Sequence, residues 1–446
     1  MKISKWQICI ICSYLLLILF FILIRVFFLK FFLQILFEDR YVEWAQFYFL
    51  VLTSLLCFKL TWDKWIKDKR INYFYILFGI FCMLVAFDEI SWGQRILDFK
   101  SPQFFIKYNA QKETEFHNII GHHLINKVID YSYLIGLMGI IYGVVLPIAF
   151  SFSKRIAAIF QRFNLVVPPK ILITGFLSGA LFMGLSNIAL IEEIGEFFIY
   201  LSFFYFLLIK WYEQKKNKTD NKEQFSFSWI LFKISIFILC LAVFSTFITD
   251  MHGRYYGPGV IAKYLAYTNA YAYYGFYNEA IEQYENALGI KNNYQDYSFL
   301  KNLNNADIKI PSSVRTSISI LDIYGDFRIS LFAHPRSDIT YKLTLPERPL
   351  LTFGIGLDSK SWGADKGDGV LFEIYVRDGS VRERVFSKYI DPKNKSEDRK
   401  WHDEVVDLSK YGGKVVSLSF VTTPGPNNNP DYDWAGWSNP KLITVK

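Results

Sequence analysis

Seven long apolar runs dominate the first 250 residues of this chain, and short polar segments separate them. The runs lie near 7–29, 42–61, 72–92, 131–152, 170–190, 194–212 and 228–248. A helix needs about 20 predominantly apolar residues to cross a bilayer. The pattern therefore predicts an α-helical polytopic membrane domain of seven spans over residues 1–250.

The period of the apolar positions changes to two from about residue 312. Stretches such as FRISLFAHP, ITYKLTLP, VLFEIYVRDG and KVVSLSFVTT alternate apolar and polar side chains, with Gly, Pro, Asn and Asp between them. This alternation is typical of half-buried strands joined by turns. It predicts an extracytoplasmic all-β jelly-roll sandwich of about seven to nine short strands over residues 312–446.

A Tyr-rich segment, residues 251–311, joins the two regions. Its sequence YTNAYAYYGFYNEAIEQYENALGI resembles one tetratricopeptide unit, which implies two antiparallel helices. Two roles suit such a helical hairpin: a spacer between the membrane domain and the sandwich, or a groove that docks a protein partner. Arrays of this repeat need about three copies, so we expect this single hairpin to pack on its neighbours.

The charge distribution predicts an orientation for the membrane domain. The chain is 52% hydrophobic and has a formal net charge of +8. Many of its Lys and Arg residues lie in the loops WDKWIKDKR, SKRIAAIFQRFNLVVPPK and KWYEQKKNKTDNKE, which the positive-inside rule puts in the cytosol. We therefore expect a multi-pass protein of a bacterial cytoplasmic membrane, with a cytoplasmic N-terminus, an extracytoplasmic C-terminal domain and no nucleic-acid partner.

Polar and ionisable side chains gather at the predicted outer ends of the spans. The third run ends in FDEISWGQR, the loop after it reads YNAQKETEFHNIIGHHLINK, and the turn before the sixth run reads NIALIEEIGEFF. Ionisable groups at membrane depth are costly and usually functional. The candidate residues are Asp88, Glu89, Arg95, Asn109, Gln111, Glu113, His117, His122, Glu193 and Glu196.

Two interpretations of this cluster remain open. In the first, the residues are interfacial: the acids favour the dipole at the start of a helix, and Arg95 pairs with Asp88 or Glu89. In the second, they form a catalytic site around a divalent ion such as Zn²⁺, which carboxylates and neutral imidazoles bind well. The candidate metal ligands are Glu89, His117, His122, Glu193 and Glu196.

The catalytic interpretation assigns roles to these groups. A bound metal lowers the pKa of its water toward about 7, and a further carboxylate takes the proton. Arg95 holds an anionic headgroup, because the guanidinium fork matches phosphate. The candidate catalytic residues are Asp88, Glu89, Arg95, His117 and Glu193, and the candidate substrate-binding residues of this site are Asn109, Gln111 and Glu113.

The stretches DEISWGQRI, NAQKETEFHN and EEIGEF resemble motifs of uncharacterised bacterial multi-span membrane proteins, which carry an EEISWGQR-like stretch. The resemblance covers roughly residues 40–210, and Asp88 stands where that pattern has its first Glu. It implies that the polar residues of the first two stretches act as one unit. It implies no particular activity.

The C-terminal region resembles galactose-binding-like and carbohydrate-binding-module sandwiches, through SWGADKGDGVLFEIYV, WHDEVVDLSKYGGKVVSLSF and DYDWAGWSNPKL. The resemblance implies glycan binding. Trp362 and Trp437 would then stack on sugar faces, while Asp368 and Asp433 would accept hydroxyl hydrogens or hold Ca²⁺, which prefers oxygen ligands. The alternative is that the tryptophans belong to the core and the Asp–Gly clusters to turns.

These patterns support two functions of different classes. The first is a metal-assisted hydrolase or transferase acting on a membrane lipid or lipid-linked glycan at the outer leaflet. The second is a non-catalytic scaffold, sensor or assembly factor of the cell envelope that binds glycan. A convergence of Glu89, His117 and Glu193 in one cavity would favour the enzyme.

Overall fold

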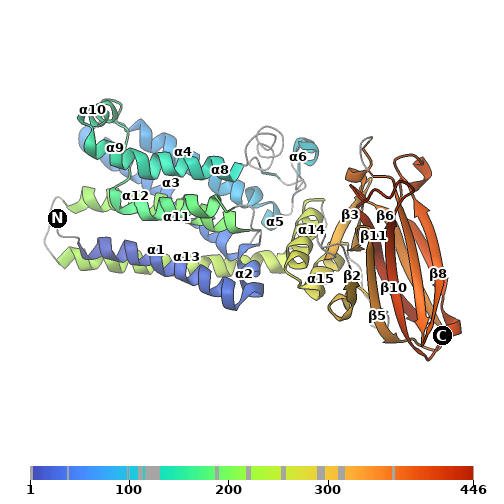
Figure 1. Ribbon diagram of the computed structural model, residues 1–446. Helices are drawn as coiled ribbons and strands as arrows, with labels where there is room; N and C mark the ends of the chain where they lie inside the picture. The colour runs from blue at the N-terminus through green and yellow to red at the C-terminus, as the bar shows by residue number, and fades with distance from the viewer. Residues whose placement is uncertain are drawn as a thin grey trace. The chain divides into compact units, whose positions relative to one another are not determined.

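The structure, a computed structural model, describes residues 4–37, 40–97, 99, 101–108, 114–115, 131–185, 190–216, 222–252, 258–288, 297–309, 317–363 and 367–444. The chain divides into two compact units, Met1–Val260 and Ile261–Lys446. Figure 1 shows that the first is helical, whereas the second combines a few helices with two packed sheets.

The first unit consists of helices of very different lengths. They are α1 (Lys5–Phe27), α2 (Leu29–Leu36), α3 (Tyr41–Asp68), α4 (Tyr73–Glu89), α5 (Gln94–Leu97), α6 (Gln103–Tyr108), α8 (Tyr131–Ile140), α9 (Leu146–Phe152), α10 (Lys154–Arg162), α11 (Ile173–Met183), α12 (Ile191–Lys216) and α13 (Lys222–His252). A π-helical segment, Ile141–Val145, connects α8 to α9 without a break in the backbone.

Five helical segments in the described residues are long and apolar enough to cross a membrane, by length and composition. They are Trp6–Phe27, Tyr41–Asp68, Ile135–Phe152, Ile191–Lys215 and Trp229–Thr249. The runs predicted at 72–92 and 170–190 form shorter helices: α4 has 17 residues and α11 has 11. This composition indicates a membrane protein, while the count of seven spans and their orientation remain predictions.

Helix α12 lies at the centre of the helical unit and packs against α3 and α11. Its apolar window is 78% buried, which is the largest share among the five long helices. Helix α11 can approach α12 closely because a glycine of α11 faces it. A Cβ added at Gly175 would come within 2.3 Å of the Ser202 hydroxyl. That hydroxyl lies 2.9 Å from the hydroxyl of Tyr14 on α1, so this polar contact joins α1 to α12 beside Gly175 of α11.

The predicted hairpin is present as α14 (Pro258–Tyr273) and α15 (Tyr277–Leu288). The turn between them uses Gly275, whose φ of +82° is accessible to glycine at little cost. The hydroxyl of Tyr284 on α15 donates to the carbonyl of Phe327 in the sandwich at 3.1 Å. The hairpin therefore packs on the sandwich, while its likeness to a tetratricopeptide unit remains a prediction.

The second unit contains a two-layer β-sandwich whose described strands pair antiparallel. One sheet has the order β3-β4-β11-β6-β9, with β1 also on β11, and the other has the order β2-β5-β10-β7-β8. The strands are β1 (Tyr297–Ser298), β2 (Asp307–Lys309), β3 (Ser317–Ile323), β4 (Asp326–Phe332), β5 (Ser337–Thr344), β6 (Pro349–Leu357), β7 (Val370–Asp378), β8 (Val381–Ile390), β9 (His402–Asp407), β10 (Val415–Pro424) and β11 (Ala435–Thr444).

Candidate functional site

The DEISWGQR stretch forms a sharp kink at the end of α4. The helix stops at Glu89, and both Ser91 and Trp92 have left-handed backbone conformations, with φ of 47° and 57°. Such conformations cost residues with a Cβ of order 1–3 kcal/mol each, and they concentrate at functional sites. The Trp92 ring stacks on Phe87, with ring centroids 5.6 Å apart. The kink ends the predicted third span earlier than its hydrophobicity suggested.

Glu89 is buried at this kink, with 8% of its surface exposed. The hydroxyl of Tyr200 on α12 donates to its carboxylate at 3.1 Å. A buried carboxylate needs such donors, because an unsatisfied charge is costly in an apolar setting. Tyr200 was missed in the sequence because it lies 111 positions from Glu89, within an apolar run.

Gln94 connects the kink to the loop that follows. Its side-chain amide donates to the Ser101 hydroxyl at 3.0 Å, and its carbonyl oxygen accepts from the backbone N–H of Thr114 at 3.1 Å. Both Gln94 and Thr114 are buried, and the neighbouring Glu115 is only 1% exposed. Gln94 is therefore a positioning residue of the candidate site, and its place within the DEISWGQR motif could have identified it.

The start of α12 contributes the acids predicted from NIALIEEIGEFF. Glu193 and Glu196 are both half-buried. The side chain of Gln46 on α3 donates to the backbone carbonyl of Glu193 at 2.9 Å, which fixes this turn against α3. Asp88, also half-buried, is the last residue but one of α4.

The predicted zinc site is only partly within the described residues. Asn109, Gln111, Glu113, His117 and His122 lie outside them, as does the side chain of Arg95. Among the described residues, no group of three or more His, Cys, Asp or Glu side chains is arranged to hold a metal ion. The metal role of Glu89, Glu193 and Glu196 together with the two histidines therefore remains a prediction.

Trp437 lies in the core of the sandwich, so the prediction that it stacks on sugars is wrong. Its side chain is fully buried. Its ring meets those of Phe353, Phe372 and Phe420 at centroid distances of 5.4, 5.0 and 5.1 Å. The ring stabilises the packing of the two sheets, because aromatic side chains bury large apolar areas.

Trp362, by contrast, reaches the surface and forms an aromatic platform with Tyr324. Its ring is partly buried against Leu321, Ile323 and Trp401, and its indole N–H donates to the carbonyl of Leu357 at 3.1 Å. The Tyr324 ring lies edge-on to it, with centroids 5.0 Å apart. Tyr324 is 71% exposed. It was missed because its sequence position, in the turn between β3 and β4, indicates only a loop.

The backbone holds this platform in place. Tyr324 has a φ of 51°, and the following Gly325 has a φ of 86°. Asn-Gly is the usual sequence at such a hairpin turn, so a tyrosine here is unusual. The carboxylate of the buried Asp358 accepts from the backbone N–H groups of Asp322 at 3.1 Å and Lys360 at 2.9 Å. Asp358 thereby ties the segment that carries Trp362 to the hairpin that carries Tyr324.

Asp368 and Asp433 form a buried acidic pair elsewhere in the sandwich. Asp368 is satisfied, since its carboxylate accepts from the N–H groups of Gly425 at 3.1 Å and Asn427 at 2.6 Å. Asp433 is 1% exposed, and the backbone N–H groups of Asp368 and Gly369 approach its carboxylate without forming well-aligned hydrogen bonds. Burial, and to a smaller extent repulsion from the Asp368 carboxylate, raises the pKa of Asp433 to about 7.

The Ca²⁺ predicted at this pair remains a prediction, since no group of three or more His, Cys, Asp or Glu side chains in the described residues is arranged to hold a metal ion. A buried carboxylate without well-aligned hydrogen bonds is costly unless a cation or a proton compensates it. A Cβ at Gly367 would come within 2.5 Å of the Asp433 carboxylate, so only glycine leaves that oxygen accessible from this side. Ca²⁺ takes carboxylate and backbone carbonyl oxygens, and both kinds lie here. The side chains that would hold it are those of Asp368 and Asp433.

The chain has a relative among archaeal proteins. A segment of 129 residues is 47% identical to an uncharacterised protein of Archaeoglobus fulgidus, and it covers 28% of this chain. It spans about a third, 32%, of that relative. No family model matches the chain.

Solved structures with a similarity to the chain come from carbohydrate-active proteins. One holds the CBM51-2 domain, in complex with GlcNAc, and INT domains of Clostridium perfringens ZmpB: it is 20% identical over 31% of this chain and 27% of that chain, with a TM-score of 0.21. Another is the GH115 4-O-methyl-α-glucuronidase BtGH115A, 9% identical over 47% of this chain and 30% of that chain, with a TM-score of 0.20.

Proposed function

We propose that this protein is a membrane-anchored glycan-binding protein of the cell envelope, whose sandwich recognises carbohydrate through the Tyr324–Trp362 platform. The observation that carries the proposal is the exposure of Tyr324, 71%, at a backbone position that disfavours it. A large aromatic ring held at such cost on the surface serves a contact outside the fold. Sugar rings present C–H faces that pack on aromatic planes, and their hydroxyls need polar neighbours.

Polar groups suited to sugar hydroxyls surround the platform. The carboxylate of Asp322 accepts from the N–H of Gly325 at 2.7 Å, which leaves its other oxygen available at the turn. Lys360 lies two residues after Asp358, and its backbone N–H donates to the Asp358 carboxylate at 2.9 Å. The Ca²⁺ proposed at Asp368 and Asp433 would stabilise the loops 367–369 and 425–433 rather than touch this platform.

A replacement of Tyr324 by Asn tests the proposal cleanly. Asn is favoured at this turn, so Tyr324→Asn removes the ring without disturbing the hairpin. The full chain in detergent is applied to an array of glucose-, galactose- and N-acetylglucosamine-terminated oligosaccharides. We expect the glycans retained by the wild type to bind Tyr324→Asn about two- to twelvefold more weakly, since an aromatic contact contributes roughly 0.5–1.5 kcal/mol.

The matched control is Tyr273→Asn, which removes another exposed tyrosine, 59% exposed, from the helical hairpin of the same unit. It should bind glycans like the wild type. If Tyr324→Asn binds as tightly as the wild type, or if the wild type retains no glycan, the platform has no such role.

The kink at Glu89 favours a second function. A hydrolase or transferase acting on a lipid or lipid-linked glycan at the outer leaflet uses a positioned carboxylate with a nearby donor, as Glu89 and Tyr200 supply, and strained backbone like that of Ser91–Trp92 concentrates at functional sites. In this proposal Glu89, Glu193 and His117 would hold Zn²⁺, and the ion would supply a water of lowered pKa. Arg95 holds the phosphate of the substrate.

Elemental analysis tests this second function. The zinc content of the purified wild type is compared with that of His117→Ala and Glu89→Gln, and Glu383→Gln on the sandwich serves as the control. The proposal expects zinc in the wild type and in the control, and its loss from the other two variants. Equal zinc in all four proteins would remove His117 and Glu89 as ligands.

A further inference from the structure

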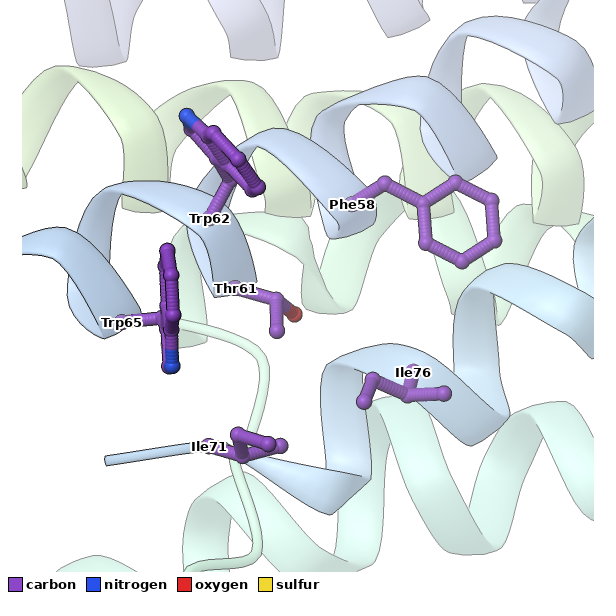
Figure 2. Close-up of a pocket in the computed structure, with 6 residues that line it drawn as sticks. All are labelled: Phe58, Thr61, Trp62, Trp65, Ile71 and Ile76. Atoms are coloured by element: carbon purple, nitrogen blue, oxygen red, sulfur yellow. The ribbon is translucent and has the colours of Figure 1, made fainter. Parts of the chain in front are cut away.

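A hollow of about 450 Å³ lies between the end of α3 and the start of α4 (Figure 2). Its size falls within the roughly 300–1,000 Å³ typical of small-ligand sites. The lining is almost wholly apolar, and its one hydroxyl, on Thr61, already donates to the carbonyl of Cys57 at 3.0 Å. The lining residues are Phe58, Thr61, Trp62, Trp65, Ile71 and Ile76.

Several apolar side chains that line this hollow are partly exposed. Trp62 is 57% exposed, Trp65 is 40% exposed and Ile71 is 43% exposed. Figure 2 shows side chains of α3 on one side and Ile71 and Ile76 on the other. An apolar surface of this shape gains free energy from any hydrocarbon that fills it, because the contact removes apolar area from water. The hollow therefore suits an alkyl chain.

One rim of the hollow is strongly basic. Residues 59–70, KLTWDKWIKDKR, contain five Lys or Arg and two Asp, a formal charge of +3. The ammonium of Lys69 lies 4.6 Å from the centre of the Trp65 ring, and Arg70 directly precedes Ile71. Neither Lys69 nor Arg70 forms an ion pair with another described residue. The apolar hollow suits the hydrocarbon part of an amphiphile, and the two cations beside it suit an anionic headgroup.

We propose that this hollow binds one acyl chain of an anionic phospholipid, whose phosphate faces Lys69 and Arg70. Trp, Lys and Arg at the end of a long apolar helix are typical of the membrane–water interface, where such headgroups lie. Asp63 does not oppose the phosphate, because Lys59 neutralises it at 2.7 Å. The inference rests on the membrane placement of α3 but not on glycan binding by the sandwich.

Native mass spectrometry of the full chain in mild detergent tests the inference. The probes are dioleoyl phosphatidylglycerol, which is anionic, and dioleoyl phosphatidylcholine, which is zwitterionic. We expect the wild type to bind the anionic lipid preferentially. The charge variant is Lys69→Asn with Arg70→Gln, because Asn suits the left-handed backbone of residue 69, where φ is 51°. Each lost charge should reduce the preference about fivefold.

A second variant tests the hollow itself. Thr61→Trp places a large ring in it and leaves every charge in place, so both lipids should bind more weakly. The control is Lys215→Gln, which removes a lysine that also lies over a tryptophan, 4.2 Å from the Trp211 ring centre, but at the end of α12 and outside this hollow. This control should keep the preference of the wild type.

The outcomes are distinguishable. Loss of the preference in the charge variant, together with weaker binding in Thr61→Trp, supports the proposal. An unchanged preference in the charge variant overturns it, and so does undiminished lipid binding by Thr61→Trp. Resistance of the wild type to carbonate extraction from membranes is measured first, and its failure would overturn the membrane placement on which this inference depends. The glycan array result has no bearing on any of these outcomes.

Discussion

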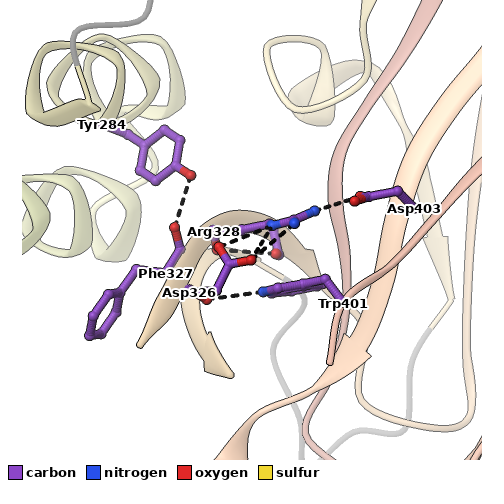
Figure 3. A network of polar contacts seen from close by, with 7 residues as sticks. Tyr284, Asp326, Phe327, Arg328, Trp401 and Asp403 are labelled. Atoms are coloured by element: carbon purple, nitrogen blue, oxygen red, sulfur yellow. Dashed lines mark hydrogen bonds and ion pairs between the residues drawn. The ribbon is translucent and has the colours of Figure 1, made fainter. Parts of the chain in front are cut away.

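The hydroxyl of Tyr284 donates to the backbone carbonyl of Phe327 at 3.1 Å, and this bond connects helix α15 to strand β4. Figure 3 shows it beside a second network in which Arg328 bridges Asp326, at 3.0 Å, and Asp403. The indole N–H of Trp401 donates to the carbonyl of Asp326 at 3.0 Å. Strand β4 is thus held from both sides, and the helical hairpin and the sandwich form one unit.

Replacement of Tyr284 by Phe should weaken this junction. The change leaves the Phe327 carbonyl without its donor, and we expect a loss of about 0.5–1.5 kcal/mol in the free energy of unfolding of the second unit. Thermal unfolding of the full chain in detergent, followed by calorimetry, measures it. Tyr324→Phe, which removes a hydroxyl from an exposed ring, is the control and should unfold like the wild type.

Replacement of Trp437 by Ala should destabilise the sandwich by about 3–5 kcal/mol, because it creates a large cavity among tightly packed rings. The same calorimetric scan detects the change as a lower unfolding temperature. A Trp437→Ala protein that unfolds at the wild-type temperature would contradict the core position of this ring.

The stability of the sandwich should depend on pH through Asp433. Its pKa in the folded protein, about 7, lies above the ordinary value of 3.8, so the folded state holds a proton that the unfolded state releases. The stabilisation from this proton is complete below about pH 4 and is lost as the pH rises toward 7. Unfolding temperatures of wild type and Asp433→Asn across this range should therefore converge at low pH and separate above it.

Added Ca²⁺ should reverse the effect of pH on the wild type. The ion binds the ionised carboxylates of Asp368 and Asp433, so above pH 7 it should raise the unfolding temperature in proportion to the logarithm of its concentration. Asp433→Asn should show a much smaller response. An equal response in both proteins would place any bound ion elsewhere.

Replacement of Gly175 by Ala should disrupt the helical unit. The new methyl group would meet the hydroxyls of Ser202 and Tyr14 at 2.3–2.5 Å, and overpacking of this kind costs about 1–3 kcal/mol. Gly184→Ala is the matched control, because its nearest neighbours would lie 3.4 Å away. Unfolding by increasing fractions of SDS in mixed micelles should separate the two variants.

Periodicity predicted the element types well, and it failed where a contact depends on distant residues. Alternation identified the strands of the sandwich, and apolar runs located the long helices. The burial of Trp437 could not be read from its flanking turn-rich sequence, because its neighbours Phe353 and Phe372 come from other strands. Tyr200 and Glu89 lie on different helices, and only packing of α12 against the end of α4 brings them together.

Strand β11 has a kinetic consequence for the biogenesis of the sandwich. It lies between β4 and β6, and β1 also pairs with it, so three separate parts of its sheet are joined only by residues 435–444. Until the ribosome has added those residues, the β3–β4 hairpin and the β6–β9 pair have no strand between them. If the sandwich is exported across the membrane as predicted, this sheet closes only after β11, its last strand in the chain, has crossed.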